Sequence, residues 1–171
     1  MAMNAILPDF RGAPIEVRYR AELTDTAGNP AHAATYIPRR LIVLDEELLD
    51  SDTAGNKSEH DRILLHELFH FVWVRLGNPR RLAWEELLRQ EWTARARGEA
   101  GWSAEWRKRL LTARDLAGRT RRWREYCCES FCDTAAWIYV GDNAEMTLAP
   151  GRGRRRREWF SRELATGWLA I

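Results

Sequence analysis

The sequence has few cysteines, no long uncharged apolar run and no recognisable secretory leader. Its apolar stretches, such as residues 134–140, are far shorter than the roughly 20 residues that cross a bilayer, which excludes a membrane span. The first residues lack the basic start, the apolar stretch and the cleavage site of a secretory signal. Cys127, Cys128 and Cys132 lie in one short segment, so they cannot cross-link distant parts of the chain. These absences favour a cytoplasmic protein with reduced thiols.

Lysine is also scarce, because Lys57 and Lys108 are the two lysines beside 25 arginines. The formal net charge is +2, but residues 80–124 hold 13 basic and 6 acidic residues. Five of the nine tryptophans lie in this basic block: Trp84, Trp92, Trp102, Trp106 and Trp123. Tryptophan interleaved with arginine could stack on nucleic-acid bases. We favour a helix that buries Trp84 and Trp92 while its arginines are solvated, so nucleic acid is the less favoured partner.

Hydrophobic periodicity predicts an α+β fold that is mostly helical. Alternating apolar and polar residues predict a strand over 15–20, and residues 35–44 predict a second strand. Pro38 favours a sheet edge for the second strand, because proline cannot donate to the ladder. Helical patterns follow over residues 58–76, 80–97, 103–117, 120–140 and 155–169. We expect a single domain over residues 1–171, with a small antiparallel or mixed sheet near its amino terminus.

Local signals mark the limits of two of these helices. Ser58 with Asp61 three residues later resembles a capping box, in which both side chains bind amides at a helix start. The last helix places Phe160, Leu164 and Trp168 four residues apart, which predicts one continuous apolar face. The first long helix should therefore begin near Ser58, and the last one should include Trp168.

The feature that carries chemistry is an H-E-x-x-H sequence, His66-Glu67-Leu68-Phe69-His70, within the first long helix. Residues four apart share a helix face, so both imidazoles can bind one metal ion while Glu67 lies beside the open position. The surrounding residues are apolar, and a buried Glu67 needs a partner. The alternative is a pair of hydrogen-bonded core histidines, with Glu67 paired to an arginine of the basic block. Catalytic zinc usually takes three protein ligands, so a metal site needs one more.

Carboxylates are better candidates for the third ligand than the two remaining histidines. His60 lies nearly opposite His66 on the helical wheel, and His32 lies in a turn-rich region, which makes it a weaker candidate. Glu129 and Asp133 lie four apart on one face of a later helix, among mostly apolar residues. Two acids buried there need cations. A metal ion and a metal-bound imidazole would supply them.

H-E-x-x-H on one helix followed by E-x-x-x-D on a later one resembles the gluzincin group of zinc metallopeptidases. The chain is most similar to the small single-domain forms and to the ImmA/IrrE type of regulatory peptidase, which implies a minimal zincin-like core. The resemblance implies that Glu129 is the third zinc ligand and that Asp133 orients His66. Such peptidases hold the substrate main chain along an edge strand, for which residues 36–44 are the candidate.

Two departures from known groups refine this resemblance. Trp73 stands where the metzincin extension requires glycine, which excludes that group. His70 and Glu129 are 59 positions apart, more than in the best-known gluzincins. The basic, tryptophan-rich helices at about 78–119 therefore look like an insertion in the peptidase core.

The resemblance implies peptide-bond hydrolysis, with Zn²⁺ as cofactor and a peptide or protein as substrate. Glu67 would act as the general base toward a water molecule whose pKa zinc lowers to roughly 7. Tyr126, one turn before Glu129, is the first candidate for a donor to the oxyanion, with Tyr139 and Tyr36 as alternatives. A half-buried helix tyrosine is the ordinary interpretation of Tyr126.

A second hypothesis is a binding or regulatory module with a structural or inactive zinc site. Its basic helices would contact an acidic partner or nucleic acid. Cys128 and Cys132 are also four residues apart and could bind zinc in place of a carboxylate. Zinc sites that combine histidine with cysteine are usually structural and closed, whereas Glu67 beside the histidines favours an open, hydrolytic site.

Overall fold

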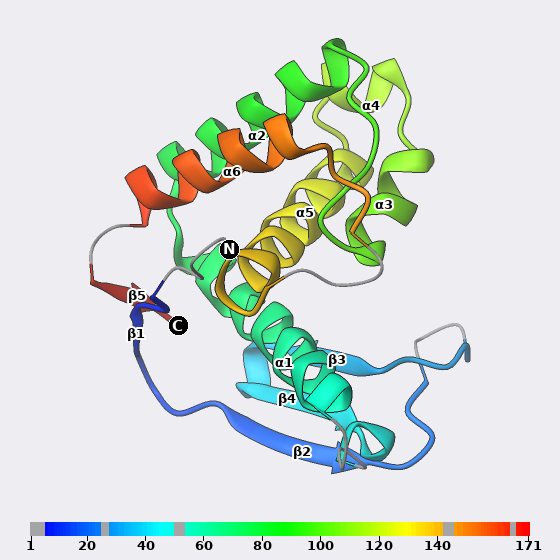
Figure 1. Ribbon diagram of the computed structural model, residues 1–171, viewed down its shortest axis with the longest axis vertical. Helices are drawn as coiled ribbons and strands as arrows, with labels where there is room; N and C mark the ends of the chain where they lie inside the picture. The colour runs from blue at the N-terminus through cyan, green and yellow to red at the C-terminus, as the bar shows by residue number, and fades with distance from the viewer. Residues whose placement is uncertain (1–5, 25–27, 50–53, 142–145, 165–166) are drawn as a thin grey trace.

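The computed structural model describes residues 6–24, 28–49, 54–141, 146–164 and 167–171. These residues form an α+β fold that is mostly helical, with a small sheet of strands from near the amino terminus, as the sequence predicted. Figure 1 shows that one long helix, α1 (Ala54–Arg75), lies between this sheet and the remaining helices. Among the described residues, none of the helices combines the length and the apolarity needed to span a bilayer.

The sheet has the order β2 (Glu16–Arg20), β4 (Leu41–Asp45), β3 (Ala33–Tyr36). It is mixed, because β4 pairs in parallel with β2 and antiparallel with β3. All five residues of β4 are buried, which explains the unbroken apolar run of this central strand. The prediction of one edge strand over 35–44 is wrong: Pro38 lies in a single 3₁₀ turn between two strands, of which β3 is an edge strand and β4 is the central strand.

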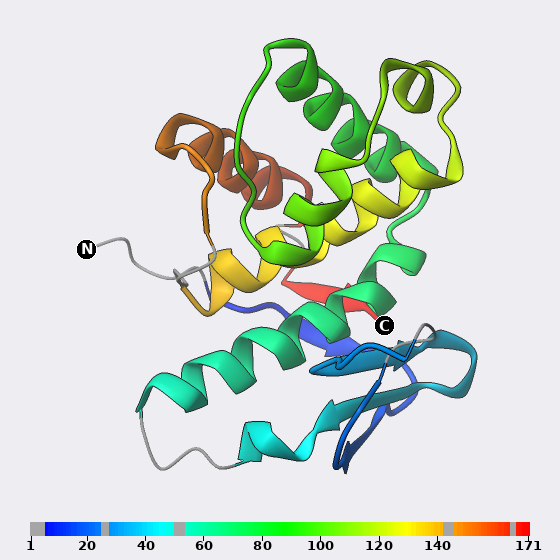
Figure 2. The same cartoon turned by 90° about the vertical axis from the view of Figure 1, so that its right-hand side faces the viewer.

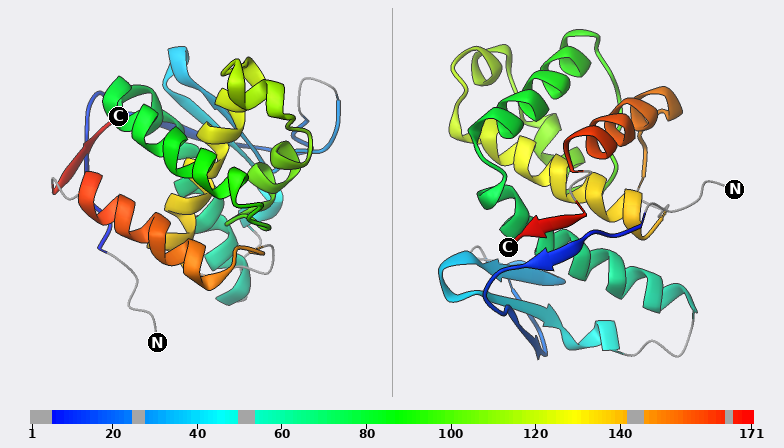
Figure 3. Two further views of the ribbon diagram at one scale, coloured as in Figure 1. Left: turned by 90° about the horizontal axis from the view of Figure 1, so that it is seen from above. Right: turned by 90° about the vertical axis from the view of Figure 1, so that its left-hand side faces the viewer.

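The two ends of the described chain meet in a separate parallel pair, β1 (Asp9–Arg11) with β5 (Trp168–Ala170). The right-hand view of Figure 3 shows these strands side by side, in blue and red. The prediction that the last helix includes Trp168 is wrong, because α6 (Pro150–Glu163) ends earlier and pairing with β1 makes Trp168 part of a strand. Phe160 is buried, as predicted, but Trp168 is 43% exposed.

The first long helix begins four residues earlier than predicted, at Ala54. Ser58 therefore lies inside α1, where its amide has an intrahelical acceptor, and the capping-box prediction is wrong. Gly77 separates α1 from α2 (Asn78–Thr93), and its φ of +78° suits a residue without a Cβ. Pro79 lies in the first turn of α2, where its missing N–H does not cost a helical hydrogen bond.

The predicted helix over 103–117 consists of two helices, α3 (Trp102–Arg109) and α4 (Ala113–Ala117). Thr112 and Asp115 form a capping box at the start of α4. The Asp115 carboxylate accepts from the Thr112 amide at 2.9 Å and from the Thr112 hydroxyl at 2.7 Å. A new helix start at this point is the reason that the predicted long helix is divided.

The centre of the helical part is α5 (Arg121–Tyr139), which packs against α1 and α3. Figure 2 shows α1 crossing below α5, with the sheet beyond α1, and Figure 1 shows α2 and α6 side by side over the other side of α5. This arrangement leaves one face of α5 opposite α1 and another face opposite the core.

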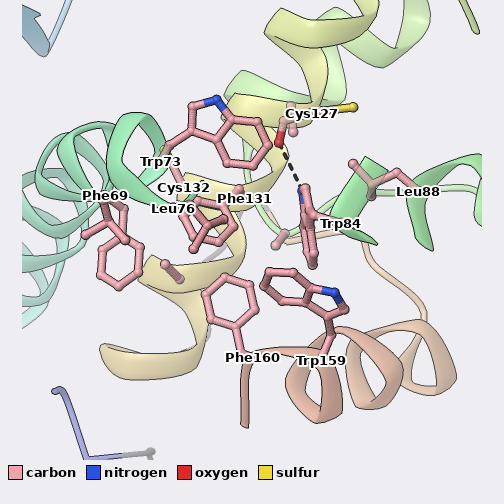
Figure 4. Packing of buried hydrophobic residues seen from close by; sticks show 14 of the residues in the cluster. Phe69, Trp73, Leu76, Trp84, Leu88, Cys127, Phe131, Cys132, Trp159 and Phe160 are labelled. Atoms are coloured by element: carbon pink, nitrogen blue, oxygen red, sulfur yellow. Dashed lines mark hydrogen bonds between the residues drawn. The ribbon is translucent and has the colours of Figure 1, made fainter. Parts of the chain in front are cut away.

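The main core is rich in aromatic rings, several of which Figure 4 shows. Trp84 of α2 donates its indole N–H to the Cys127 carbonyl at 3.0 Å. Its ring packs against Phe131, Trp159 and Phe160, at centroid distances of 5.8, 5.0 and 5.5 Å. The helices expected as an insertion at 78–119 thus share one core with α1 and α5.

Candidate metal centre

The H-E-x-x-H residues lie where α1 faces α5. Helical spacing places His66 and His70 on one face of α1, with ring centroids 5.0 Å apart. Opposite them, α5 presents Glu129 and Asp133, which also share one helix face. The structure therefore brings together both predicted histidines and both predicted acids.

Both histidines direct the same ring nitrogen toward one carboxylate. Nε2 of His66 lies 3.2 Å from Oε2 of Glu129, and Nε2 of His70 lies 4.0 Å from the same oxygen. The other nitrogens have separate partners. Nδ1 of His66 lies 2.8 Å from Oδ1 of Asp133, and Nδ1 of His70 lies 3.4 Å from the Cys128 sulfur. Partners at Nδ1 orient an imidazole so that Nε2 is available to a metal.

Asp133 is itself held in place by α3. Its Oδ2 accepts a hydrogen bond from the Ala104 amide at 2.9 Å. A side chain at Gly101 would collide with Asp133, because a Cβ there would lie 2.5 Å from the carboxyl carbon. Glycine at this position thus lets the start of α3 approach Asp133 closely.

Glu67 lies on the wall of a cavity of about 510 Å³ that also reaches His66. Its Oε2 accepts a hydrogen bond from the Thr35 hydroxyl at 2.6 Å, so the edge strand β3 orients this carboxylate. Glu67 is not paired with an arginine of the basic block in any contact found among the described residues. This carboxylate therefore borders a cavity as well as the edge strand.

Sequence reasoning missed Arg107, which α3 brings to the site. Its Nη2 lies 3.3 Å from Oε1 of Glu129, and its side chain lines the same cavity. Its Nη1 donates to the Ser103 carbonyl at 3.0 Å. No local pattern marks this arginine among the many others of the basic block, because the contact with Glu129 arises only when α3 packs on α5.

The site has more negative than permanent positive charge. Glu67, Glu129 and Asp133 contribute three carboxylates, and Arg107 is the one arginine or lysine found in contact with them among the described residues. Buried carboxylates need cations nearby. A divalent metal ion would balance this excess.

The excess of negative charge also changes the pKa values of the two histidines. Burial by itself would lower the pKa of His66, but the Asp133 carboxylate, with help from Glu129, raises it well above its ordinary value. Burial also opposes charge at His70, where Cys128 and Glu129 nevertheless raise the pKa to about 9. In turn, burial would raise the pKa of Glu129, but the neighbouring histidines hold it well below its usual range. The carboxylate of Glu129 is therefore ready to bind a cation.

Two of the three separations in a set of His66, His70 and Glu129 can be compared with those of a zinc site. Donor atoms about 2.0 to 2.2 Å from a tetrahedral zinc lie about 3.3 to 3.6 Å from one another. The separations of 3.2 and 4.0 Å between Glu129 and the two Nε2 atoms lie close to that range. His66, His70 and Glu129 would hold the ion, and Asp133 would orient His66.

Cys132 offers an alternative third ligand. Ligand atoms of His66, His70 and Cys132 all lie within 4.8 Å of one another. The thiolate is the form that binds metal, but burial and the nearby Cys128 raise the pKa of Cys132 well above its ordinary value. Because its pKa is lowered, Glu129 is ionised without a metal, and we therefore favour it over Cys132 as the third ligand.

Tyr126 is not part of this site. Its side chain is buried and its hydroxyl donates to Glu99 at 2.6 Å. Ser130, one turn later, also donates to Glu99, at 3.1 Å. This stripe of α5 therefore faces the core, whereas Glu129 faces α1, and the expectation that Tyr126 assists catalysis does not hold.

The other residues considered from the sequence lie in different places. The Tyr139 ring packs 5.7 Å from Phe69, and burial raises the pKa of Tyr139 to about 12. His60 lies 2.8 Å from the Tyr19 hydroxyl, away from His66 and His70. His32 lines the cavity. Tyr36, in β3, is 42% exposed.

Comparisons of the chain with protein families, with curated proteins and with solved structures found no match. The geometry of the site is therefore the basis for a functional conclusion.

Proposed function

We propose that this protein is a zinc-dependent metallopeptidase of the gluzincin type that hydrolyses peptide bonds. The observation that carries the proposal is the convergence of two histidine Nε2 atoms on the Glu129 carboxylate, with Glu67 beside them on a cavity wall. Three such ligands with an adjacent carboxylate are the usual set of a hydrolytic zinc site. An open cavity favours catalysis over a closed structural role.

Glu67, Thr35 and Arg107 each have a defined task in this reaction. Zinc, when bound, supplies Lewis acidity that polarises a carbonyl and makes a water molecule more acidic. Glu67 accepts the proton of that water and passes it to the leaving amine. Thr35 holds Oε2 of Glu67, and Oε1 would take the proton. Arg107 holds the Glu129 carboxylate in place through an ion pair at 3.3 Å.

The substrate main chain would pair with the free edge of β3. In the antiparallel ladder with β4, the Asp45 amide donates to the His32 carbonyl, so Ala34 and Tyr36 also face β4. Ala33 and Thr35 therefore present their amide and carbonyl groups outward. Ala33 lines the cavity and Thr35 contacts Glu67, so an added strand would lie beside the proposed base.

The direct test combines zinc content with cleavage of a broad peptide library. We expect about one zinc per chain, lost in His66→Ala because a ligand is removed. Glu67→Gln should keep zinc but lose cleavage, by at least about 100-fold, because the base is removed. Glu59→Gln is the matched control, since Glu59 lies on the same helix and lines the same cavity. Zinc-free purified protein, or full cleavage by Glu67→Gln, would contradict the proposal.

A structural zinc site is the second candidate, and the position of Cys132 favours it. With His66 and His70, Cys132 forms a compact set of potential ligands. In that case Cys132→Ala would abolish zinc binding and Cys127→Ala would not. A catalytic site with Glu129 as ligand predicts that both cysteine variants keep zinc. A cytoplasmic location belongs to the proposal as well, because all three cysteines are free thiols.

A further inference from the structure

Two tryptophans of α3 remain exposed in a protein that buries most of its aromatic rings. Trp102 is 61% exposed and Trp106 is 47% exposed, whereas Trp84 and Trp123 are completely buried. The two exposed rings stack on each other, with centroids 6.2 Å apart and planes 15° apart. The guanidinium of Arg107 lies over the Trp106 ring, 5.4 Å from its centroid. Exposed aromatic surface of this kind often marks a recognition site.

This aromatic surface belongs to the cavity of the candidate metal centre. Trp102 and Trp106 line the same cavity as His66 and Glu67. Arg107 connects the two parts, because it contacts both Trp106 and Glu129. A peptide bound with its scissile bond at Glu67 would therefore bring a neighbouring side chain to the tryptophans.

The backbone of α3 that carries the tryptophans is anchored next to the proposed metal ligands. Ala104, between them in the sequence, is completely buried, and its amide donates to Asp133. Asp133 in turn contacts His66. An anchored helix favours selective binding, because its backbone does not have to be ordered when a ligand arrives.

The charges on the cavity wall indicate a neutral occupant. Arg62 pairs with Glu59 at 2.6 Å, and Arg107 pairs with Glu129 at 3.3 Å. These arginines are already matched by carboxylates, so a nucleic-acid phosphate would meet no uncompensated cation at either of them. A flat aromatic side chain, in contrast, gains from stacking on tryptophan without needing a charge partner.

We infer that Trp102 and Trp106 form a subsite that selects peptides with an aromatic residue close to the scissile bond. The inference rests on the proposed peptidase function for its meaning in catalysis. Binding of the aromatic side chain can be measured without catalysis, so the two proposals can fail separately.

The binding experiment uses the zinc-loaded Glu67→Gln protein and blocked alanine hexapeptides in which one phenylalanine is moved through each position. NMR titration measures each dissociation constant against that of the all-alanine peptide. We expect one position to bind about tenfold more tightly, the effect of burying and stacking one aromatic ring. When Trp102→Ala and Trp106→Ala are added to this protein, its affinity for the preferred peptide should fall to its affinity for the all-alanine peptide. Adding Trp168→Ala should not lower it, because Trp168 is an exposed tryptophan outside the cavity.

Steady-state kinetics of the two tryptophan substitutions, made in the enzyme that keeps Glu67, then show whether KM or kcat changes. The double variant should raise KM for the preferred phenylalanine peptide about tenfold and leave kcat within about twofold, because ground-state binding is lost. Zinc content should not change. If the double variant folds poorly, Trp102→Ala alone replaces it, since Trp102 is the more exposed ring.

Three results would overturn the subsite. They are equal binding of all peptides, a phenylalanine preference that survives in the tryptophan variants, and binding of a single-stranded oligonucleotide that those variants abolish. If the preference for phenylalanine appears in Glu67→Gln but the unchanged enzyme cleaves no peptide, hydrolysis fails and the subsite stands. If the unchanged enzyme cleaves peptides without any preference for phenylalanine, hydrolysis stands and the subsite fails.

Discussion

Two clusters of charged side chains lie on different faces of α5, and they differ in how their charges balance. In the Arg156 cluster, Arg156 donates to Glu91 at 2.7 Å and to Glu99 at 2.6 Å. All three side chains are completely buried. Lys108 donates to Glu99 at 2.8 Å, so two cations meet two carboxylates. This cluster is enclosed and electrically complete.

The histidine cluster is open and incomplete. It consists of His66, His70, Glu67, Glu129, Asp133 and Arg107. Its three carboxylates exceed its one permanent cation, and four of its residues line the cavity: His66, Glu67, Arg107 and Asp133. A buried cluster with matched charges can only hold the fold together, whereas an unmatched cluster beside a cavity can bind a cation. The comparison therefore separates a structural role from a functional one on the same helix.

The largest change in stability is expected when the central cation of the Arg156 cluster is removed. Arg156→Ala should reduce the free energy of unfolding by about 3 to 5 kcal/mol, because it leaves two buried carboxylates without their partner. Urea denaturation measures the change. Arg154→Ala is the control, since Arg154 is 79% exposed and its ion pair should contribute below about 1 kcal/mol. Equal destabilisation by both variants would refute the assigned role of Arg156.

The enclosed cluster should also make stability depend on acid. Burial would raise the pKa of Glu99, but Arg156 and Lys108 lower it from 4.5 to about 2. A lowered folded pKa means that this stabilisation is present above pH 4.5 and is lost as the pH falls toward 2. The lowered pKa of Glu99 contributes on the order of 3 kcal/mol to the free energy of unfolding at neutral pH. In urea titrations Glu99→Gln should flatten the stability curve between these pH values; an unchanged slope would contradict the prediction.

In the open cluster, the third zinc ligand should dominate metal affinity. Glu129→Ala should weaken zinc binding by at least about 100-fold, because a direct ligand is removed. Competition with a chelator measures the dissociation constant. Glu125→Ala is the control on the same helix, since Glu125 is paired with Arg121 at the surface. A larger loss in Glu125→Ala would reassign the ligand.

A smaller effect is expected from the residue that orients His66. Asp133→Asn should weaken zinc binding about 10- to 100-fold, because the neutral amide orients the imidazole less well. The Asn oxygen can still accept from the Ala104 amide, so the melting temperature should change little. The same chelator competition measures the first effect and calorimetry the second. Unchanged zinc affinity would show that Asp133 serves only to hold α3.

Much of the site could be predicted because its pairs are local. His66 with His70, and Glu129 with Asp133, are each four residues apart, and helical periodicity places such residues on one face. The same reasoning failed for Tyr126. Three residues advance a helix by about 300°, so Tyr126 lies about 60° away from Glu129 around α5. That rotation directs it to the core rather than to the cavity.

The contributions of α3 could not be predicted. Arg107 and the stacked pair Trp102 and Trp106 reach the cavity only because α3 packs on α5 at Gly101 and Asp133. The edge strand was misplaced for a related reason. Proline marks a position that cannot donate, but it does not distinguish a strand at the edge from a turn between two strands. Pairing with distant residues decides between them.

The sequence by itself determined the fold class and the two pairs of candidate site residues, since both follow from periodicities of a few residues. Only the tertiary structure decided that the pairs meet at the Glu129 carboxylate, that Tyr126 belongs to the Arg156 cluster, and that Arg107 joins the site. Helix periodicity places side chains on faces. The packing of helices determines which faces meet, and this depends on contacts between residues far apart in the chain.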